Sequence, residues 1–162
     1  MRNLLKVLVG VVAMIAVGTA AVAEEGPKYG TNVGDVAKPV KIQTMDGNEF
    51  DTGQVQEKTM FVFVNSICGL CAKEMKDLAK NADKLNDVKV YLVSVDQNKE
   101  RAMKVYEKYA KLFGLLYDPE YVFGEAVGLY ATPSTLVVDK GGKILFKKTG
   151  YRGDIEDILK TL

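Results

Sequence analysis

Two cysteines separated by two residues are the part of this chain best suited to chemistry. Cys68 and Cys71 are the only cysteines in the 162-residue sequence. Residues three apart on a helix are neighbours on one face, within reach of a disulfide. The free N–H groups and partial positive charge at a helix N-terminus favour the thiolate, which is the nucleophile in thiol–disulfide exchange. The spacing therefore predicts a redox-active pair in which Cys68 attacks and Cys71 resolves the mixed disulfide.

Other uses of a cysteine pair fit the sequence less well. The chain contains no histidine, and a zinc site needs four ligands as a rule, so we expect neither a metal nor a cofactor. Haem attachment requires a histidine after the second cysteine, where this chain has Ala72. A structural disulfide stays open as an alternative. It would close a very short loop and contribute less than the roughly 3 kcal/mol of a 15-residue loop.

The cysteines lie between segments typical of a parallel β-α-β unit. Residues 60–64 are a continuous apolar run suited to a buried central strand. Residues 72–85 carry apolar side chains at helical spacing, and residues 88–95 form a second buried strand. A strand, helix and strand in this order predict a right-handed crossover. Cys68 then stands at the carboxyl end of a strand, where α/β sheets bind ligands.

The rest of the chain predicts one α/β domain over residues 34–162, with a mixed sheet and helices on both faces. The expected elements are a β-hairpin at 40–51, helices at 99–113 and 118–127, strands at 134–138 and 143–147, and a last helix from Asp154 to residue 162.

The first 23 residues have the pattern of a secretory signal peptide. Arg2 and Lys6 precede an apolar run over residues 7–22, which ends in the small residues of Ala21-Val22-Ala23. An uncleaved membrane anchor is the alternative, although the run is short against the roughly 20 residues that span a bilayer. Residues 24–33 are expected to be a flexible lead-in. Export places the cysteines in an oxidising compartment, where a disulfide persists.

Charge and composition exclude other classes of protein. The chain has 22 basic and 21 acidic residues, for a formal net charge of +1. This balance offers no electrostatic attraction to nucleic acid or to an anionic membrane. Hydrophobic residues make up 48% of the sequence, which is typical of a globular domain rather than a disordered one.

The sequence resembles the thioredoxin superfamily, and within it the exported redoxin branch of TlpA- and ResA-like proteins. The resemblance spans roughly residues 33–162 and is most specific at the CxxC and Thr-Pro motifs. The segments that carry it are Val33-Gly34-Asp35 with Pro39 and Asp46-Gly47, Phe61 to Cys71, Thr132-Pro133-Ser134, and Val137 to Ile144.

The resemblance implies roles for three further residues. Pro133 should be a cis-proline lying against the disulfide, and Thr132 should offer its main-chain groups to an extended substrate. Glu74 should tune the cysteines, because a nearby carboxylate raises the pKa of a thiol. The alternative for Glu74 is a solvated helix residue between Lys73 and Lys76.

Three residues depart from the family pattern. Ile67 replaces the usual tryptophan before the first cysteine, and Val62 stands where thioredoxin has a buried aspartate. Lys76 stands where many relatives have a proline that kinks the helix. These changes affect the contacts with partners and the pKa values of the cysteines, but both thiols stay in place.

Three other functions are alternatives to thiol–disulfide exchange for a chain of this fold. A peroxiredoxin shares the fold, but its peroxidatic loop requires Pro and Thr or Ser where this chain has Phe61 and Asn65. A Sco-type copper-delivery protein requires CxxxC and a histidine. A non-catalytic binding module would keep the fold and use the cysteine pair as a structural disulfide.

Partners follow from the resemblance to the TlpA- and ResA-like branch. Its members are usually periplasmic or otherwise extracytoplasmic reductants that keep exported cysteines reduced, often for cytochrome c maturation. We therefore expect protein thiol or disulfide substrates, a membrane thiol transporter as electron donor, no nucleic acid, and a monomer.

Overall fold

The computed structural model describes residues 28–162, and the expected signal peptide at residues 1–23 lies outside them. The strands are β1 (Lys41–Thr44), β2 (Glu49–Asp51), β3 (Thr59–Val64), β4 (Lys89–Ser94), β5 (Gly114–Tyr117), β6 (Ser134–Val138) and β7 (Ile144–Thr149). The helices are α1 (Gly69–Lys80), α2 (Lys99–Tyr106), α3 (Val122–Ala126) and α4 (Ile155–Leu159). Short 3₁₀ helices cover Thr52–Gln54, Ala82–Leu85 and Glu107–Tyr109.

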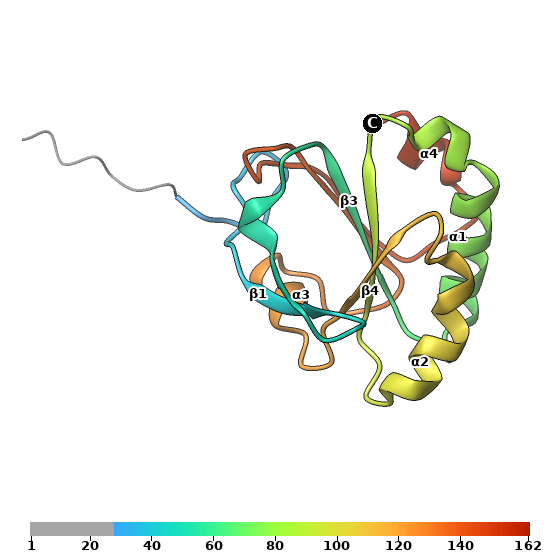
Figure 1. Ribbon diagram of the computed structural model, residues 1–162. Coiled ribbons are helices and arrows are strands. Elements are labelled where there is room, and N and C mark those ends of the chain that lie inside the picture. Colours follow the sequence, from blue (N-terminus) through green and yellow to red (C-terminus); the bar gives the residue numbers. More distant parts are fainter. Residues whose placement is uncertain (1–27) are drawn as a thin grey trace, which may run out of the picture.

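The strands form one mixed sheet in the order β2-β1-β5-β4-β3-β6-β7 (Figure 1). The strand β3 pairs in parallel with β4 and antiparallel with β6. All six of its residues are buried, which explains why the five residues after Thr59 are all apolar rather than alternating. The expected mixed sheet, with a hairpin at its N-terminal edge, is confirmed.

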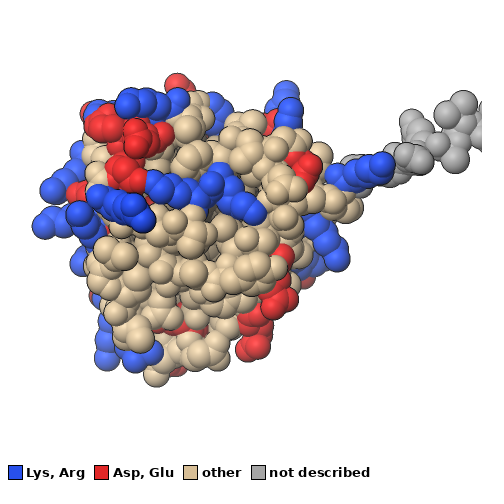
Figure 2. Space-filling view, turned by 180° about the vertical axis from the view of Figure 1, so that it is seen from behind, with Lys and Arg blue, Asp and Glu red and all other residues tan. Residues whose placement is uncertain are grey.

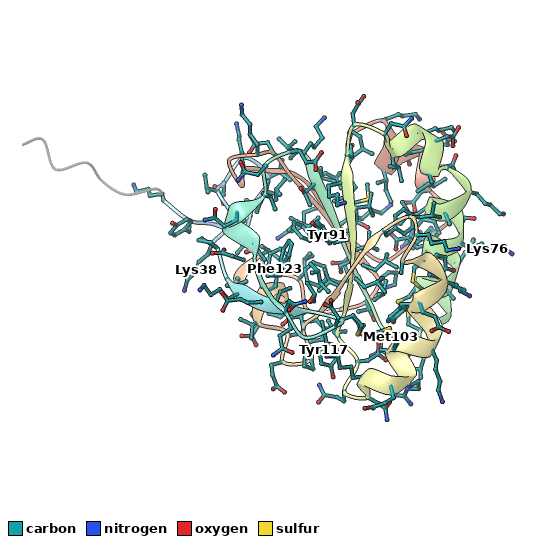
Figure 3. The ribbon with its side chains drawn as sticks, in the orientation of Figure 1. Lys38, Lys76, Tyr91, Met103, Tyr117 and Phe123 are labelled. Carbon is teal, nitrogen blue, oxygen red and sulfur yellow. A yellow bond between two sulfur atoms is a disulfide. The ribbon has the colours of Figure 1, made fainter. Side chains whose placement is uncertain are left out.

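Helices cover both faces of the sheet, as expected. In Figure 1, α1, α2 and α4 lie on one side of the sheet and α3 lies on the other. Buried residues of the three helices pack with one set of strand residues, and residues of α3 pack with the opposite set. The second set contains an aromatic cluster in which Phe61 packs against Tyr91 and Phe123, with ring centroids 5.7 and 4.8 Å apart. Tyr91 and Phe123 of this cluster are labelled in Figure 3.

The helix after Cys68 begins and ends earlier than the expected range of 72–85. It begins at Gly69, because the Cys68 sulfur accepts a hydrogen bond from the Cys71 N–H and so caps the helix. It ends at Lys80, where Asn81 leaves helical geometry and its side-chain amide donates to the carbonyl of Asp77. A 3₁₀ helix covers the remaining expected residues.

The expected helix at 99–113 is also shorter, and the strand β5 was not predicted. The helix α2 ends at Tyr106, and a 3₁₀ turn leads into β5, which pairs in parallel with β4. With β5, the parallel part of the sheet has three strands. The strand β5 also pairs with β1 and so joins the N-terminal hairpin to the centre of the sheet.

Two aspartates near helix starts differ in what they do. The side chain of Asp118 accepts hydrogen bonds from three backbone N–H groups at the start of α3, so the helix expected from residue 118 begins at Val122. Asp154 precedes α4, as expected of an N-cap, but its side chain makes no capping hydrogen bond. It forms an ion pair with Lys148 on β7 instead.

The domain has contacts N-terminal to residue 34. Tyr29 bridges to Val36, and the backbone N–H of Gly30 donates to the Val36 carbonyl. Within residues 28–162, no helix has the length and apolar character needed to cross a membrane.

Candidate active site

The two cysteines lie at the N-terminus of α1, directly after the central strand β3. They form a disulfide, with Cα atoms 5.2 Å apart. The Cys71 N–H lies 3.1 Å from the Cys68 sulfur, so the first turn of the helix presents a donor to the atom that would carry the thiolate charge. Cys71 is fully buried and Cys68 is partly exposed, which is the arrangement expected of a resolving and an attacking thiol.

The loop before β6 lies against this disulfide. The peptide bond between Thr132 and Pro133 is cis, as the resemblance implied. The Cys68 sulfur is 3.8 Å from the Thr132 carbonyl oxygen. The Ser134 hydroxyl donates to the Ala131 carbonyl at 2.7 Å. The fold therefore brings together residues that are more than sixty positions apart in the sequence.

Glu74 is buried between α1 and the sheet, three residues after Cys71. Its side chain is only 1% exposed, so the alternative of a solvated residue is wrong. The Thr135 hydroxyl donates to Glu74 Oε1 at 2.6 Å, whereas Oε2 has no hydrogen-bond partner among the described residues. Burial raises the pKa of Glu74 to about 7, against the opposing effects of the Thr135 hydrogen bond and the charge of Lys148. The carboxyl can therefore gain or lose a proton near neutral pH.

Lys76, two residues after Glu74 on the same helix, lies away from the site. It is exposed on α1 and points outward from the sheet in Figure 3. Because Glu74 faces the sheet and Lys76 faces water, the two residues have different surroundings despite their closeness in sequence.

Asp96 supports the active-site turn and was not singled out from the sequence. It is fully buried after β4, and both of its carboxylate oxygens lie 3.0 Å from the backbone nitrogen of Ser66. The hydroxyls of Ser94 and Tyr106 also donate to it, at 2.8 and 3.0 Å. This network holds the chain two residues before Cys68. The sequence signal for Asp96 is a single acidic residue directly after a buried strand, because a buried carboxylate needs hydrogen-bond donors around it.

Exposed apolar side chains flank the cysteines in the sequence and on the surface. Ile67, Leu70 and Tyr130 are 76%, 52% and 72% exposed. Ile67 and Leu70 adjoin the cysteines, and Tyr130 is in the loop that contacts Cys68 through Thr132. Figure 2 shows a stretch of surface without charged side chains below a band of basic ones, bordered by acidic side chains at the lower right and basic ones at the lower left. We call Ile67, Leu70 and Tyr130 the apolar rim, and it offers a surface for a partner's apolar residues.

Comparison with known proteins identifies the family. The Redoxin family matches residues 32–162, which is most of the chain, so the chain belongs to this family. The protein FixW of Rhizobium leguminosarum is 32% identical over 72 residues, which are 44% of this chain and 33% of FixW. The chain thus matches about a third of the length of that relative.

Solved structures of thiol–disulfide oxidoreductases have the same fold. A putative thiol:disulfide interchange protein DsbE from Chlorobium tepidum is 22% identical, with a TM-score of 0.67 over 81% of this chain and 94% of that one. The thioredoxin domain of a thiol-disulfide oxidoreductase from Bacteroides vulgatus is 25% identical, with a TM-score of 0.64 over 80% and 99%. A secreted disulfide oxidoreductase of Mycobacterium tuberculosis, homologous to E. coli DsbE, is 17% identical, with a TM-score of 0.64 over 76% and 96%.

These similarities confirm the thioredoxin-like fold. Residues 32–162 are therefore a Redoxin-family domain of thioredoxin-like fold that carries a Cys68–Cys71 disulfide.

Proposed function

We propose that this protein is an exported reductant that exchanges its Cys68–Cys71 dithiol with disulfides of other proteins. The observation that carries the proposal is a cysteine pair at the start of a helix, with its outer sulfur 3.8 Å from the Thr132 carbonyl. A thiolate is favoured at a helix start, and the neighbouring loop offers backbone groups to an extended substrate.

The proposed reaction transfers two electrons to the substrate. The Cys68 thiolate attacks one sulfur of a substrate disulfide, and the other substrate sulfur leaves as a thiolate. The Cys71 thiol then loses its proton and attacks Cys68, which forms the internal disulfide and releases the second substrate sulfur. The substrate has become a dithiol and the pair a disulfide, so a donor dithiol must reduce the pair before another cycle.

The neighbouring residues have distinct roles in this proposal. The Thr132–Pro133 loop pairs with substrate backbone beside the disulfide. The carboxyl of Glu74, three residues after Cys71, accepts or returns the proton of the resolving thiol, which its pKa of about 7 suits at neutral pH. The apolar rim receives apolar residues next to the substrate cysteines.

The location and the partners are part of the proposal. The signal-peptide pattern of residues 1–23 supports export, and a related protein from Mycobacterium tuberculosis is described as secreted. Protein disulfides form in such compartments, so a reductant there has substrates. A membrane thiol transporter would return the electrons, cytochrome c maturation is the proposed pathway, and the protein would act as a monomer.

Insulin reduction tests the activity, and the potential of the couple tests its direction. We expect the protein to precipitate insulin chains with dithiothreitol as the electron source. The Cys68–Cys71 potential should lie near that of thioredoxin, about −270 mV, rather than near that of DsbA, about −120 mV. Insulin that stays soluble would indicate a structural disulfide in a binding module. A potential near −120 mV would indicate an oxidant.

Replacing Glu74 by glutamine should lower the pKa of the cysteine thiols and make the couple more oxidising. The charge of Glu74 opposes a second negative charge three residues away on the same helix, and glutamine removes it. Thiolate absorbance against pH should show coupled steps in the wild type, because Glu74 itself titrates near pH 7, and a simpler curve in the variant. Superimposable curves and equal potentials against glutathione would show that Glu74 does not tune the thiols.

A further inference from the structure

Lys148 lies on β7 in the same cross-strand row as the hydrogen-bond partner of Glu74. Val62, Thr135 and Lys148 stand directly opposite one another on β3, β6 and β7. Directly paired residues of an antiparallel ladder point to the same face, and Thr135 points to α1 because its hydroxyl donates to Glu74. Lys148 therefore lies on the α1 face, one strand beyond Thr135.

An ion pair holds Lys148 in this place. Its ammonium group pairs with Asp154, the residue before α4, and the side chains are 31% and 19% exposed. Asp154 makes no capping hydrogen bond to α4; its Oδ2 pairs with Lys148, and its Oδ1 accepts a hydrogen bond from the Arg152 N–H at 3.2 Å. The strand register thus places a cation and its counter-ion on the face of the sheet that carries the Glu74 carboxyl, one oxygen of which has no hydrogen-bond partner among residues 28–162.

Few other charges face Glu74. Asp77 follows on α1 and accepts a hydrogen bond from the Tyr151 hydroxyl at 2.8 Å. Lys73 is exposed, and its ammonium group lies 5.9 Å from the centre of the Tyr151 ring. The strand β3 contributes apolar residues, and Cys71 is the titratable group on the preceding turn of α1. Among these groups, Lys148 is the cation whose charge lowers the pKa of Glu74.

We propose that Lys148 is a positioning residue of the thiol–disulfide site, which acts through Glu74. Thr135 and Lys148 hold the carboxylate form of Glu74 in place. Asp154 limits this effect, because it neutralises part of the charge of Lys148. The inference rests on the proposed thiol–disulfide exchange. It adds a partly exposed ion pair that helps to set the pH at which the buried carboxyl ionises.

The direct test is a titration of the Glu74 carboxyl carbon by NMR in the oxidised protein, where the cysteines do not titrate. The resonance is assigned by its loss in Glu74→Gln. Lys148→Met should move the midpoint upward by about half a pH unit or more, because the carboxylate loses a favourable charge. Asp154→Asn should move it downward, because Lys148 is then no longer neutralised. Lys148→Arg should restore a midpoint close to that of the wild type.

Lys76→Met is the matched control for net charge. It removes a lysine from the exposed side of α1, two residues from Glu74, and should leave the midpoint unchanged. Thr135→Val should raise the midpoint, since it removes the hydrogen bond to the carboxylate. The inference is wrong if Lys148→Met leaves the midpoint unchanged, if Lys76→Met moves it equally, or if Asp154→Asn moves it upward.

A second measurement connects Lys148 to the cysteines. Near pH 7, Lys148→Met should shift the reduction potential of the Cys68–Cys71 couple in the same direction as Glu74→Gln does. In the Glu74→Gln background, Lys148→Met should cause no further shift of that potential. An equal shift in both backgrounds would show that Lys148 does not act through Glu74. The carboxyl titration needs no turnover, so a protein that fails to reduce insulin yet shows the predicted midpoints contradicts the proposed function alone.

Discussion

Cys68→Ser should abolish the reduction of protein disulfides, with a loss of about a thousandfold or more, because no other thiol can make the first attack. Cys71 is fully buried behind the turn and cannot reach a substrate disulfide. Cys71→Ser should keep the first attack and lose the second. It should therefore accumulate mixed disulfides with substrate, which are visible on non-reducing gels and identified by mass spectrometry.

Alkylation of the reduced wild type gives an independent check on this assignment. At mildly acidic pH a limiting amount of iodoacetamide should label Cys68 first, because Cys68 is the more exposed thiol and its sulfur faces the N–H of the first helical turn. The double variant, with serine at both positions, is the control for non-specific complexes. Preferential labelling of Cys71, or trapping by Cys68→Ser rather than by Cys71→Ser, would reverse the two roles.

The centre of the fold could be predicted from the sequence because its signals are local. Residues 60–64 have no polar residue, and the cysteine motif follows the strand within a few residues. A short apolar strand followed by helical spacing and a second apolar strand leaves little choice of topology. The contact between Cys68 and the Thr132 loop came from the family resemblance, since no local pattern links residues so far apart in the chain.

The strand β5 and the surroundings of Glu74 could not be predicted in the same way. Gly114–Tyr117 has four residues and follows a helical pattern directly, so its pairing with β4 is a tertiary effect. Glu74 lies between two lysines in the sequence, which suggests a solvated face. The buried stripe of α1 nevertheless includes it, together with Cys71, Met75 and Leu78. A helical wheel places Glu74 at the edge of that stripe, and only the positions of β6 and β7 decide whether it is buried.

The burial of Glu74 should make the folded protein less stable as the pH rises through neutrality. Its pKa is about 7 in the folded protein, against an ordinary value of 4.5. Between these values the folded protein keeps a proton that the unfolded chain has released, so the free energy of unfolding falls with rising pH. The contribution is fully present below about pH 4.5 and is lost above about pH 7. A raised pKa of this size corresponds to about 3 kcal/mol.

Urea unfolding of the oxidised protein at pH 5 and pH 8 measures this contribution. Glu74→Gln keeps an oxygen that can accept the Thr135 hydrogen bond, but its side chain cannot ionise. Between the two pH values, the free energy of unfolding of the variant should therefore fall by about 2–3 kcal/mol less than that of the wild type. Glu107→Gln removes the same charge from an exposed site and should follow the wild type, which controls for net charge. Equal losses in the wild type and in Glu74→Gln would show that the carboxyl stays ionised in the folded protein at pH 5. Glu74 could not then hold the proton that the proposed exchange assigns to it.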